Sequence, residues 1–195
     1  MRNCFDVCDQ FLNARSRMRD PATGLYYHGY DESRRAAWAD PSSGCSRSFW
    51  LRAVGWLVMA LVDTLEKMDE QIYYEYRMLE AMLKDLIDSL LRFERPDGMF
   101  YQVIDRSGEE GNYPETSGTC MVAYGILKAV RLRLLPERYR SFGERIFRGV
   151  EGRYFTVRNS GPVLGGICLV CGLGGEEGRD GSAAYYYRAP VVEND

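Results

Sequence analysis

The sequence lacks a hydrophobic run long enough to cross a bilayer, and it lacks an excess of basic residues. Its longest apolar run, Trp56–Val62, is far shorter than the roughly 20 residues that a spanning helix needs. Lysine and arginine number 25 against 28 aspartates and glutamates, which gives a formal net charge of -3. These features predict no membrane segment and argue against a nucleic-acid partner, because phosphate backbones are bound by clustered positive charge.

The N-terminus also lacks the pattern of a secretory signal. Met1–Asp9 is polar and carries acids, whereas a signal peptide has a basic start, an apolar centre and a small-residue cleavage site. Export is therefore unsupported, and we expect a cytoplasmic protein.

The composition is that of one globular domain. The chain has 195 residues, of which 46% are hydrophobic, 27% charged and 13% aromatic. A compact chain of this size buries roughly 70% of its unfolded surface. Residues 1–195 are therefore expected to form a single domain, or a piece of a larger one, with no second domain.

The six cysteines fit a reducing compartment, because a chain of this length needs no disulfide framework. Cys168 and Cys171 form a CxxC motif, while Cys4 and Cys8 lie one helical turn apart, so four thiolates for zinc are one interpretation. The segment around the CxxC motif is apolar, and buried free cysteines behave as small hydrophobes. We favour packing, and expect no metal and no cofactor.

Apolar residues spaced three and four apart predict helices over most of the chain. The predicted helices cover Arg2–Met18, Phe49–Met68, Ile72–Phe93, Met121–Leu135 and a segment from Pro136 to about Gly149. Thr116 or Ser117 is the expected N-cap of the fourth helix. The second and third helices form one hairpin and the fourth and fifth form another, so the predicted fold is mainly α.

The composition changes after Tyr154. Glycines recur from Gly161 to Gly181 and interrupt any long helix, which predicts loops and a β-hairpin. The chain then reaches Val191–Asp195 without a predicted closing element.

An internal repeat is the most informative pattern. Gly24–Asp31 aligns with Gly98–Asp105 at an offset of 74, and Phe49–Trp56 aligns with Thr119–Ile126 at an offset of 70. A unit of one loop and two helices therefore recurs about every 70 residues. Such units bury their faces by stacking into a solenoid or closing into a ring, and we favour an α/α toroid.

The two copies differ at a few positions that carry chemistry. The first copy has His28, Trp50, Arg52 and Trp56 where the second has the space-filling residues Gln102, Cys120, Val122 and Ile126. Arg52 and Trp56 share a helix face, and together with the histidine they form a set suited to an anionic sugar.

Each of these residues also has a structural explanation. Tryptophans at helical spacing often belong to a core, and a lone histidine is more often structural than catalytic. A buried Arg52 needs an acidic partner, for which Asp31, Glu32 and Asp63 are the candidates.

Several motifs taken together resemble the unsaturated rhamnogalacturonyl hydrolases, glycoside hydrolase family 105. The segments that carry the resemblance are Gly24–Glu32, Trp38–Ala39, Gly44–Ser46, Phe49–Trp56, Asp97–Gln102, Glu115–Thr119 and Asp180–Tyr186. The HxxDE and WxRxxGW patterns occur at the family's spacing, and the similarity covers nearly the whole chain.

The resemblance implies an (α/α)6 toroid and the removal of 4,5-unsaturated galacturonate from pectin-derived oligosaccharides. A carboxylic acid protonates C4 of the vinyl ether, water adds at C5, and the hemiketal opens, without metal or nucleotide. Carried over by motif, His28, Trp50, Arg52 and Trp56 bind the substrate, with Arg52 on the uronate carboxylate.

The family's catalytic aspartate lies upstream of the HxxDE segment, before the start of this chain, so we expect the C-terminal half of the toroid. Asp31, Asp40 and Glu115 are the carboxylates that can substitute for this aspartate, with Asp31 first among them.

Three hypotheses about the function stay open. The chain is a hydrolase that works with a complementary half, a catalytically incomplete uronide-binding remnant, or an α-helical scaffold for protein contacts. Exposed inner helices predict self-association and no turnover by residues 1–195 alone.

Overall fold

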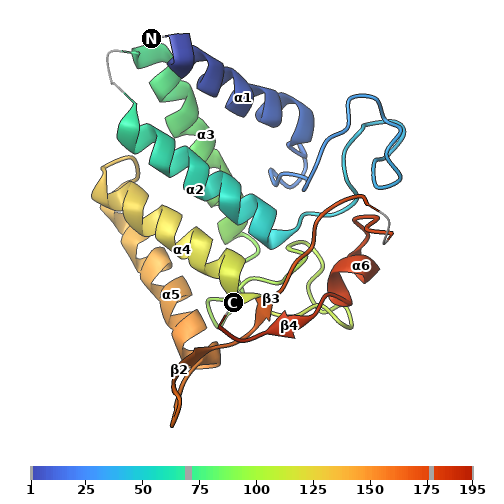
Figure 1. Ribbon diagram of the computed structural model, residues 1–195. Coiled ribbons are helices and arrows are strands. Elements are labelled where there is room, and N and C mark those ends of the chain that lie inside the picture. The colour runs from blue at the N-terminus through green and yellow to red at the C-terminus, as the bar shows by residue number, and fades with distance from the viewer. Residues whose placement is uncertain (1, 69–71, 176–177, 195) are drawn as a thin grey trace.

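The computed structural model describes residues 2–68, 72–175 and 178–194 (Figure 1). Its helices are α1 (Arg2–Met18), α2 (Leu51–Lys67), α3 (Tyr73–Leu91), α4 (Thr116–Arg131), α5 (Arg140–Tyr154) and the short α6 (Ala183–Tyr187), with a 3₁₀ turn, η1 (Glu137–Tyr139), before α5. Its strands are β1 (Phe155–Arg158), β2 (Gly161–Leu164), β3 (Ile167–Cys168) and β4 (Val191–Val192). The predicted mainly α fold is confirmed.

Two helical hairpins form the centre of the molecule. α2 packs against both α3 and α4, α4 also packs against α5, and α1 lies against α3. Figure 1 shows α2 and α4 side by side, and both begin at the end of the molecule where the long loops and β3 gather. The hairpins predicted from the repeat are therefore present, and their packing brings two helix N-termini together.

The helices form where apolar residues line one face at a period near 3.6. In α2 the buried positions are Leu51, Val54, Gly55, Val58, Leu61, Val62 and Leu65. α3 ends at Leu91, shortly before Arg95 and Pro96, because proline disfavours helical backbone in the residue that precedes it.

α2 begins two residues later than predicted because its entry is paired with the second repeat. The Leu51 amide donates to the Gln102 carbonyl at 2.9 Å, and the Ile104 amide donates to the Phe49 carbonyl at 3.1 Å. Phe49 and Trp50 are therefore held as extended backbone, and the loop of one repeat fixes the start of the helix in the other.

α4 also differs from its predicted bounds. It begins at Thr116 rather than Met121, and it ends at Arg131 rather than Leu135. Arg133 has a φ of 62°, a left-handed conformation that cannot continue a right-handed helix. The fifth predicted helix is split into η1 and α5.

The C-terminal glycine-rich part contains the predicted hairpin and one helix that the prediction missed. β1 and β2 pair antiparallel, with Phe155 opposite Leu164, while β3 and β4 form a second antiparallel pair. α6 arises inside the glycine-rich segment because Ser182 caps it, its side chain accepting from the Tyr185 amide.

The sequence repeat corresponds to a repeat in the backbone. Gly24 and Gly98, which align at the offset of 74, have φ values of 75° and 81°, a left-handed region that favours glycine. Gly55 and Gly125, which align at the offset of 70, both lie at the contact between α2 and α4. A Cβ at Gly125 would approach Val58 Cγ1 to 2.2 Å.

Buried apolar side chains form two clusters. The larger fills the space between the helices, and the smaller joins the loops to the beginning of α2. The smaller cluster consists of Trp50, Val103, Cys168, Cys171 and Tyr186. The smaller cluster brings together residues that are far apart in the sequence, at the end of the molecule where the predicted site residues lie.

None of the described helices has the length and apolar character required to span a membrane. Several large apolar side chains are exposed, including Trp56 and Tyr124 on the helices α2 and α4. Self-association through such surfaces stays a prediction.

Because α2 and α4 approach closely, one methyl group added between them should strongly lower the stability of the fold. Gly125→Ala should lower the free energy of unfolding by about 1–3 kcal/mol, because the new Cβ overlaps the stiff, fully buried Val58 side chain. Urea denaturation of the variant and the wild type measures this change in the free energy of unfolding. Gly152→Ala in α5 is the control, since nothing lies within 4 Å of its added Cβ, and it should raise stability by up to about 1 kcal/mol. Equal effects of the two substitutions would contradict the close packing.

Candidate functional site

Three of the four predicted site residues meet where α2 begins. Trp50 occupies the N-cap position of α2 and is 6% exposed. The rings of His28 and Trp50 have centroids 4.6 Å apart, and the Arg52 guanidinium carbon lies 5.5 Å from the Trp50 ring centroid. His28 and Arg52 therefore contact Trp50, which is part of the buried smaller cluster.

The fourth predicted residue, Trp56, lies one turn further along α2 and is 56% exposed. Its position follows from the spacing of four residues that places it on the same helix face as Arg52. The structure therefore provides one buried tryptophan and one exposed tryptophan, and the exposed one is available to a ligand.

A tyrosine from the far end of the chain completes the aromatic group. Tyr186, in α6, is fully buried and stacks on Trp50 with ring centroids 5.8 Å apart and an interplanar angle of 17°. Its hydroxyl shares a hydrogen bond of 2.7 Å with Nδ1 of His28. Tyr186 was not among the predicted site residues, although it ends the Asp180–Tyr186 segment that carries part of the family resemblance.

The interpretation of Gln102 as a space-filling residue was wrong. Gln102 is fully buried, accepts from Trp50 Nε1 at 3.3 Å and donates to the Tyr186 carbonyl, also at 3.3 Å. Gln102 aligns with His28 in the repeat, so equivalent positions of the two copies both contact Trp50. A buried side-chain amide needs hydrogen-bond partners. The alignment of Gln102 with His28 in the repeat was the signal that could have identified Gln102 as a residue of this site.

The Arg52 guanidinium makes four hydrogen bonds within the described part of the protein. Nε donates to Ser117 Oγ at 2.7 Å, Nη1 donates to the Leu169 carbonyl at 3.2 Å, and Nη2 donates to both Glu115 and the Cys168 carbonyl. These four bonds use four of the five N–H groups of a guanidinium. Within the described residues, one N–H group on Nη1 is left for a ligand.

The acidic partner of Arg52 is Glu115, and the prediction of Asp31, Glu32 or Asp63 was wrong. The Arg52 Nη2 atom lies 3.4 Å from Glu115 Oε1, and the exposed fractions of the two side chains are 14% and 0%. The pairing arises because α2 and α4 begin side by side. Asp63 lies further along α2, where it accepts from Tyr124 and Lys128 instead.

Glu115 is also the N-cap of α4, in place of the predicted Thr116 or Ser117. Its carboxylate accepts from the backbone amides of Ser117 at 3.1 Å and Gly118 at 2.7 Å, which satisfies two otherwise unpaired amides of the first turn. It also accepts from the Cys168 amide at 3.1 Å. One buried carboxylate therefore joins the starts of α2 and α4 to β3.

Burial lowers the pKa of His28 to about 4, because the protonated ring loses its hydration. The imidazole is therefore neutral near pH 7. It can exchange hydrogen bonds with Tyr186 and with a ligand, but it does not add positive charge to the site.

Two of the carboxylates considered as substitutes for the catalytic acid are held ionised. Backbone hydrogen bonds, the largest from the Ala36 amide, lower the pKa of Asp31 to about 2. The Ser42 side chain and nearby amides do the same for Asp40. A general acid must carry a proton near the working pH, so this environment disfavours Asp31, the first fallback, and Asp40 alike.

A pocket of about 300 Å³ adjoins the Arg52 site, because it includes Leu169, whose carbonyl accepts from Arg52. Its lining combines apolar side chains with two arginines. The lining residues are Leu169, Val170, Arg179, Tyr185, Arg188, Ala189 and Pro190.

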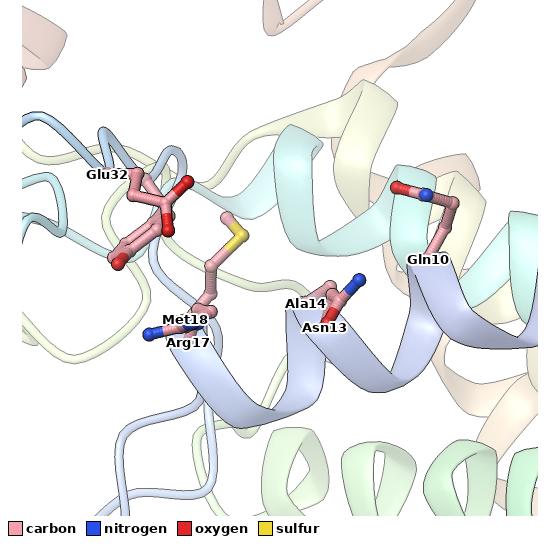
Figure 2. A pocket seen from close by; sticks show the side chains of 7 residues that line it. Gln10, Asn13, Ala14, Arg17, Met18 and Glu32 are labelled. Carbon is pink, nitrogen blue, oxygen red and sulfur yellow. The ribbon is translucent and has the colours of Figure 1, made fainter.

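A second pocket, of about 420 Å³, lies between α1 and the loop that follows it (Figure 2). It contains none of the four predicted substrate-binding residues. Its lining residues are Gln10, Asn13, Ala14, Arg17, Met18, Tyr30 and Glu32. The described His, Cys, Asp and Glu side chains form no group of three that could hold a metal ion.

Stacked helical hairpins, with polar and aromatic side chains gathered at the start of two parallel helices, match part of an α/α toroid. The chain belongs to glycosyl hydrolase family 88, whose sequence profile matches residues 3–195. The predicted kinship with family 105 is confirmed by a glycoside hydrolase of that family from C. acetobutylicum ATCC 824. Its structure superposes with a TM-score of 0.96 at 37% identity and covers 100% of this chain.

The curated relatives include Protein Atu3128 of Agrobacterium fabrum, which is 40% identical over 198 residues, covering 97% of this chain and 83% of that protein. The unsaturated rhamnogalacturonyl hydrolase YesR of Bacillus subtilis is 24% identical over 127 residues, covering 65% of this chain and 34% of that protein. The chain spans about half the length of the C. acetobutylicum structure, 54% of it.

The buried His28 predicts a specific loss of stability in mild acid. Its pKa in the folded chain lies below the ordinary value of 6.5. The unfolded chain therefore binds the proton first, and unfolding becomes easier as the pH falls from about 6.5 to about 4. Compared with His28→Gln, the wild type should lose up to about 1.4 kcal/mol more unfolding free energy per pH unit in that window. Urea denaturation at several pH values measures the difference, and equal slopes would contradict a buried neutral histidine.

Proposed function

We propose that this chain acts in the hydrolysis of pectin-derived oligosaccharides that end in 4,5-unsaturated galacturonate, and that its described residues recognise the unsaturated uronide. Membership of glycosyl hydrolase family 88 supports the hydrolase class. The similarity to YesR, which is an unsaturated rhamnogalacturonyl hydrolase, supports the substrate. Family motifs at His28, Trp50, Arg52 and Trp56 connect both to this sequence.

The observation that carries the proposal is an exposed Trp56 one helical turn from an Arg52 fixed by hydrogen bonds. A flat aromatic ring beside a rigid donor suits a sugar that has an apolar face and a carboxylate. Trp50, which is buried against Tyr186, serves to position His28 and Arg52 and does not stack on the sugar.

Arg52 orients the uronate carboxylate more than it attracts it electrostatically. Glu115 offsets its charge, and the remaining N–H group on Nη1 can make one hydrogen bond to a carboxylate oxygen. Further positive charge comes from Arg188 in the adjoining pocket. The uronate carboxylate therefore lies between the Nη1 atom of Arg52 and this pocket, with the sugar ring over Trp56.

The reaction that follows from this substrate is hydration of a vinyl ether. A proton is added at C4, water adds at C5, and the resulting hemiketal opens and releases the next sugar. We assign the proton donor to none of the carboxylates considered in this chain. Asp31 and Asp40 are held ionised, and Glu115 is enclosed by its capping bonds and by Arg52.

A uronide-binding protein without turnover is the second candidate function. The ionised state of Asp31 and Asp40 favours it, because recognition residues are present while no proton donor is assigned. The two candidates differ in one measurement, the loss of absorbance from the conjugated double bond of an unsaturated galacturonyl disaccharide. Turnover by residues 1–195 joined to the N-terminal half of a family 105 toroid supports the hydrolase, whereas binding without turnover by that joined protein supports the second candidate.

A cytoplasmic location belongs to the same proposal. The cysteines whose side chains are described are all free thiols, and thiols stay reduced in the cytoplasm.

Trp56→Ala should weaken binding of an unsaturated galacturonyl disaccharide about tenfold, as measured by titration calorimetry. Covering about 60 Å² of ring surface is worth roughly 1.5 kcal/mol, which corresponds to that factor. Arg52→Ala is a poor first test, because it leaves the buried Glu115 without its cation.

Tyr74→Ala is the matched control, since Tyr74 is also an exposed aromatic residue but lies on α3, in its first turn. It should leave the affinity unchanged. Wild-type affinity in the Trp56 variant, or equal binding of the saturated disaccharide, would overturn the proposed site.

A further inference from the structure

Two thiols lie together directly behind the Arg52 site. Cys168, in β3, and Cys171, three residues later, are both fully buried, and their Sγ atoms are 3.3 Å apart. The sequence analysis assigned these cysteines to packing, and the proposed function does not use them. Their proximity places two nucleophilic sulfurs within reach of one another without a rearrangement of the fold.

The surroundings suit a dithiol and not a metal site. The pair packs in the smaller cluster with Trp50, Val103 and Tyr186, and Gln102 Nε2 lies 3.9 Å from Cys171 Sγ. In the part of the chain that the structure describes, no group of three His, Cys, Asp or Glu side chains forms around them. Zinc requires four ligands in a structural site, so the cysteine pair alone does not provide one.

The two sulfurs are electronically unequal. The hydrogen bond from the Cys171 thiol lowers the pKa of the Cys168 thiol, with a further contribution from the positive charge of Arg52. The same interaction raises the pKa of Cys171. Cys168 is therefore the thiol that forms a thiolate first, and thiolates are the reactive form of cysteine.

The backbone of the pair is bonded directly to the proposed binding site. The carbonyls of Cys168 and Leu169 accept from Arg52, and the Cys168 amide donates to Glu115. β3 itself is a two-residue strand, and its strand partner among the described residues is the two-residue β4. Leu169 and Val170, which separate the cysteines, are 41% and 55% exposed, so the loop that carries the pair lies at the surface.

We propose that Cys168 and Cys171 form a redox-active dithiol that closes reversibly into a disulfide and thereby loosens the hydrogen bonds that hold Arg52 and Glu115. The oxidant is a small peroxide, which can reach the pair through local opening of the short β3. The effect on uronide binding rests on the proposed function, whereas the oxidation itself does not.

The chemistry balances with hydrogen peroxide as the oxidant. The Cys168 thiolate attacks one peroxide oxygen, the O–O bond breaks, and the departing hydroxide takes a proton to become water, leaving a sulfenic acid. The Cys171 sulfur then attacks that sulfenic sulfur. The S–S bond forms, the S–O bond breaks, and the hydroxyl leaves with the thiol proton as a second water. A dithiol reductant reverses the closure by exchange.

Closure shortens the distance between the two sulfurs from 3.3 Å to the roughly 2.05 Å of a disulfide. The intervening backbone must adjust, and that backbone supplies two acceptors of Arg52. Because a misplacement of about 1 Å can reduce the function of a site up to a hundredfold, we expect about tenfold weaker binding of the unsaturated disaccharide by the oxidised chain.

The test begins with the reduced chain exposed to hydrogen peroxide, then alkylated after denaturation and mapped by mass spectrometry. The peptide that contains Cys168 and Cys171 should escape alkylation and be about 2 Da lighter than its dithiol form. Treatment with dithiothreitol should restore the dithiol form of this peptide and its alkylation. Cys171→Ser should prevent closure and leave Cys168 as a sulfenic acid trapped by dimedone, whereas Cys45→Ser, which removes a buried thiol elsewhere, should leave closure unchanged.

Amide hydrogen exchange tests the effect on the site without any sugar. Oxidation should speed exchange at the amides of Ser117, Gly118 and Cys168, which all donate to Glu115. Full alkylation of both cysteines after peroxide treatment would overturn the proposal, and so would unchanged exchange in the oxidised chain. A reduced chain that closes its disulfide yet never binds the disaccharide would refute the proposed function and leave the dithiol confirmed.

Discussion

The buried ion pair between Arg52 and Glu115 is the interaction on which the arrangement of the site depends. Glu115 caps α4, Arg52 stands in the first turn of α2, and both bind the backbone of Cys168. Ser117 reinforces the pair, since its hydroxyl accepts from Arg52 and donates to Glu115, both at 2.7 Å. Two charges with exposed fractions of 14% and 0% are costly to desolvate, and these surrounding bonds make their burial tolerable.

Most of the helical fold could be predicted from the sequence, because apolar periodicity and the repeat are local signals. The errors lie where distant segments meet. α2 starts late because Leu51 bonds to Gln102, and the partner of Arg52 is Glu115 because α2 and α4 begin side by side. Tyr186 reaches Trp50 from a helix that the glycine-rich composition concealed. None of these pairings has a signature within one segment.

The same interaction connects the proposed recognition of a uronide with the proposed dithiol. Arg52 has most of its donors committed to the protein, so its value to a ligand lies in one fixed N–H group rather than in an unpaired charge. Any movement of the backbone from Cys168 to Leu169 changes where that group points. The proposed recognition and the proposed thiol chemistry therefore share two carbonyl oxygens, those of Cys168 and Leu169, in a chain that matches about half of a family 105 toroid.

A double-mutant cycle on Arg52 and Glu115 tests this account most directly. Arg52→Met and Glu115→Gln, singly and together, should give a coupling free energy above about 1 kcal/mol in urea denaturation, because each single variant leaves a buried group without its partner. The matched control is the exposed pair Arg158 and Glu193, 2.7 Å apart, which should couple by less than about 1 kcal/mol. Additive effects of Arg52→Met and Glu115→Gln would contradict the central role of the pair.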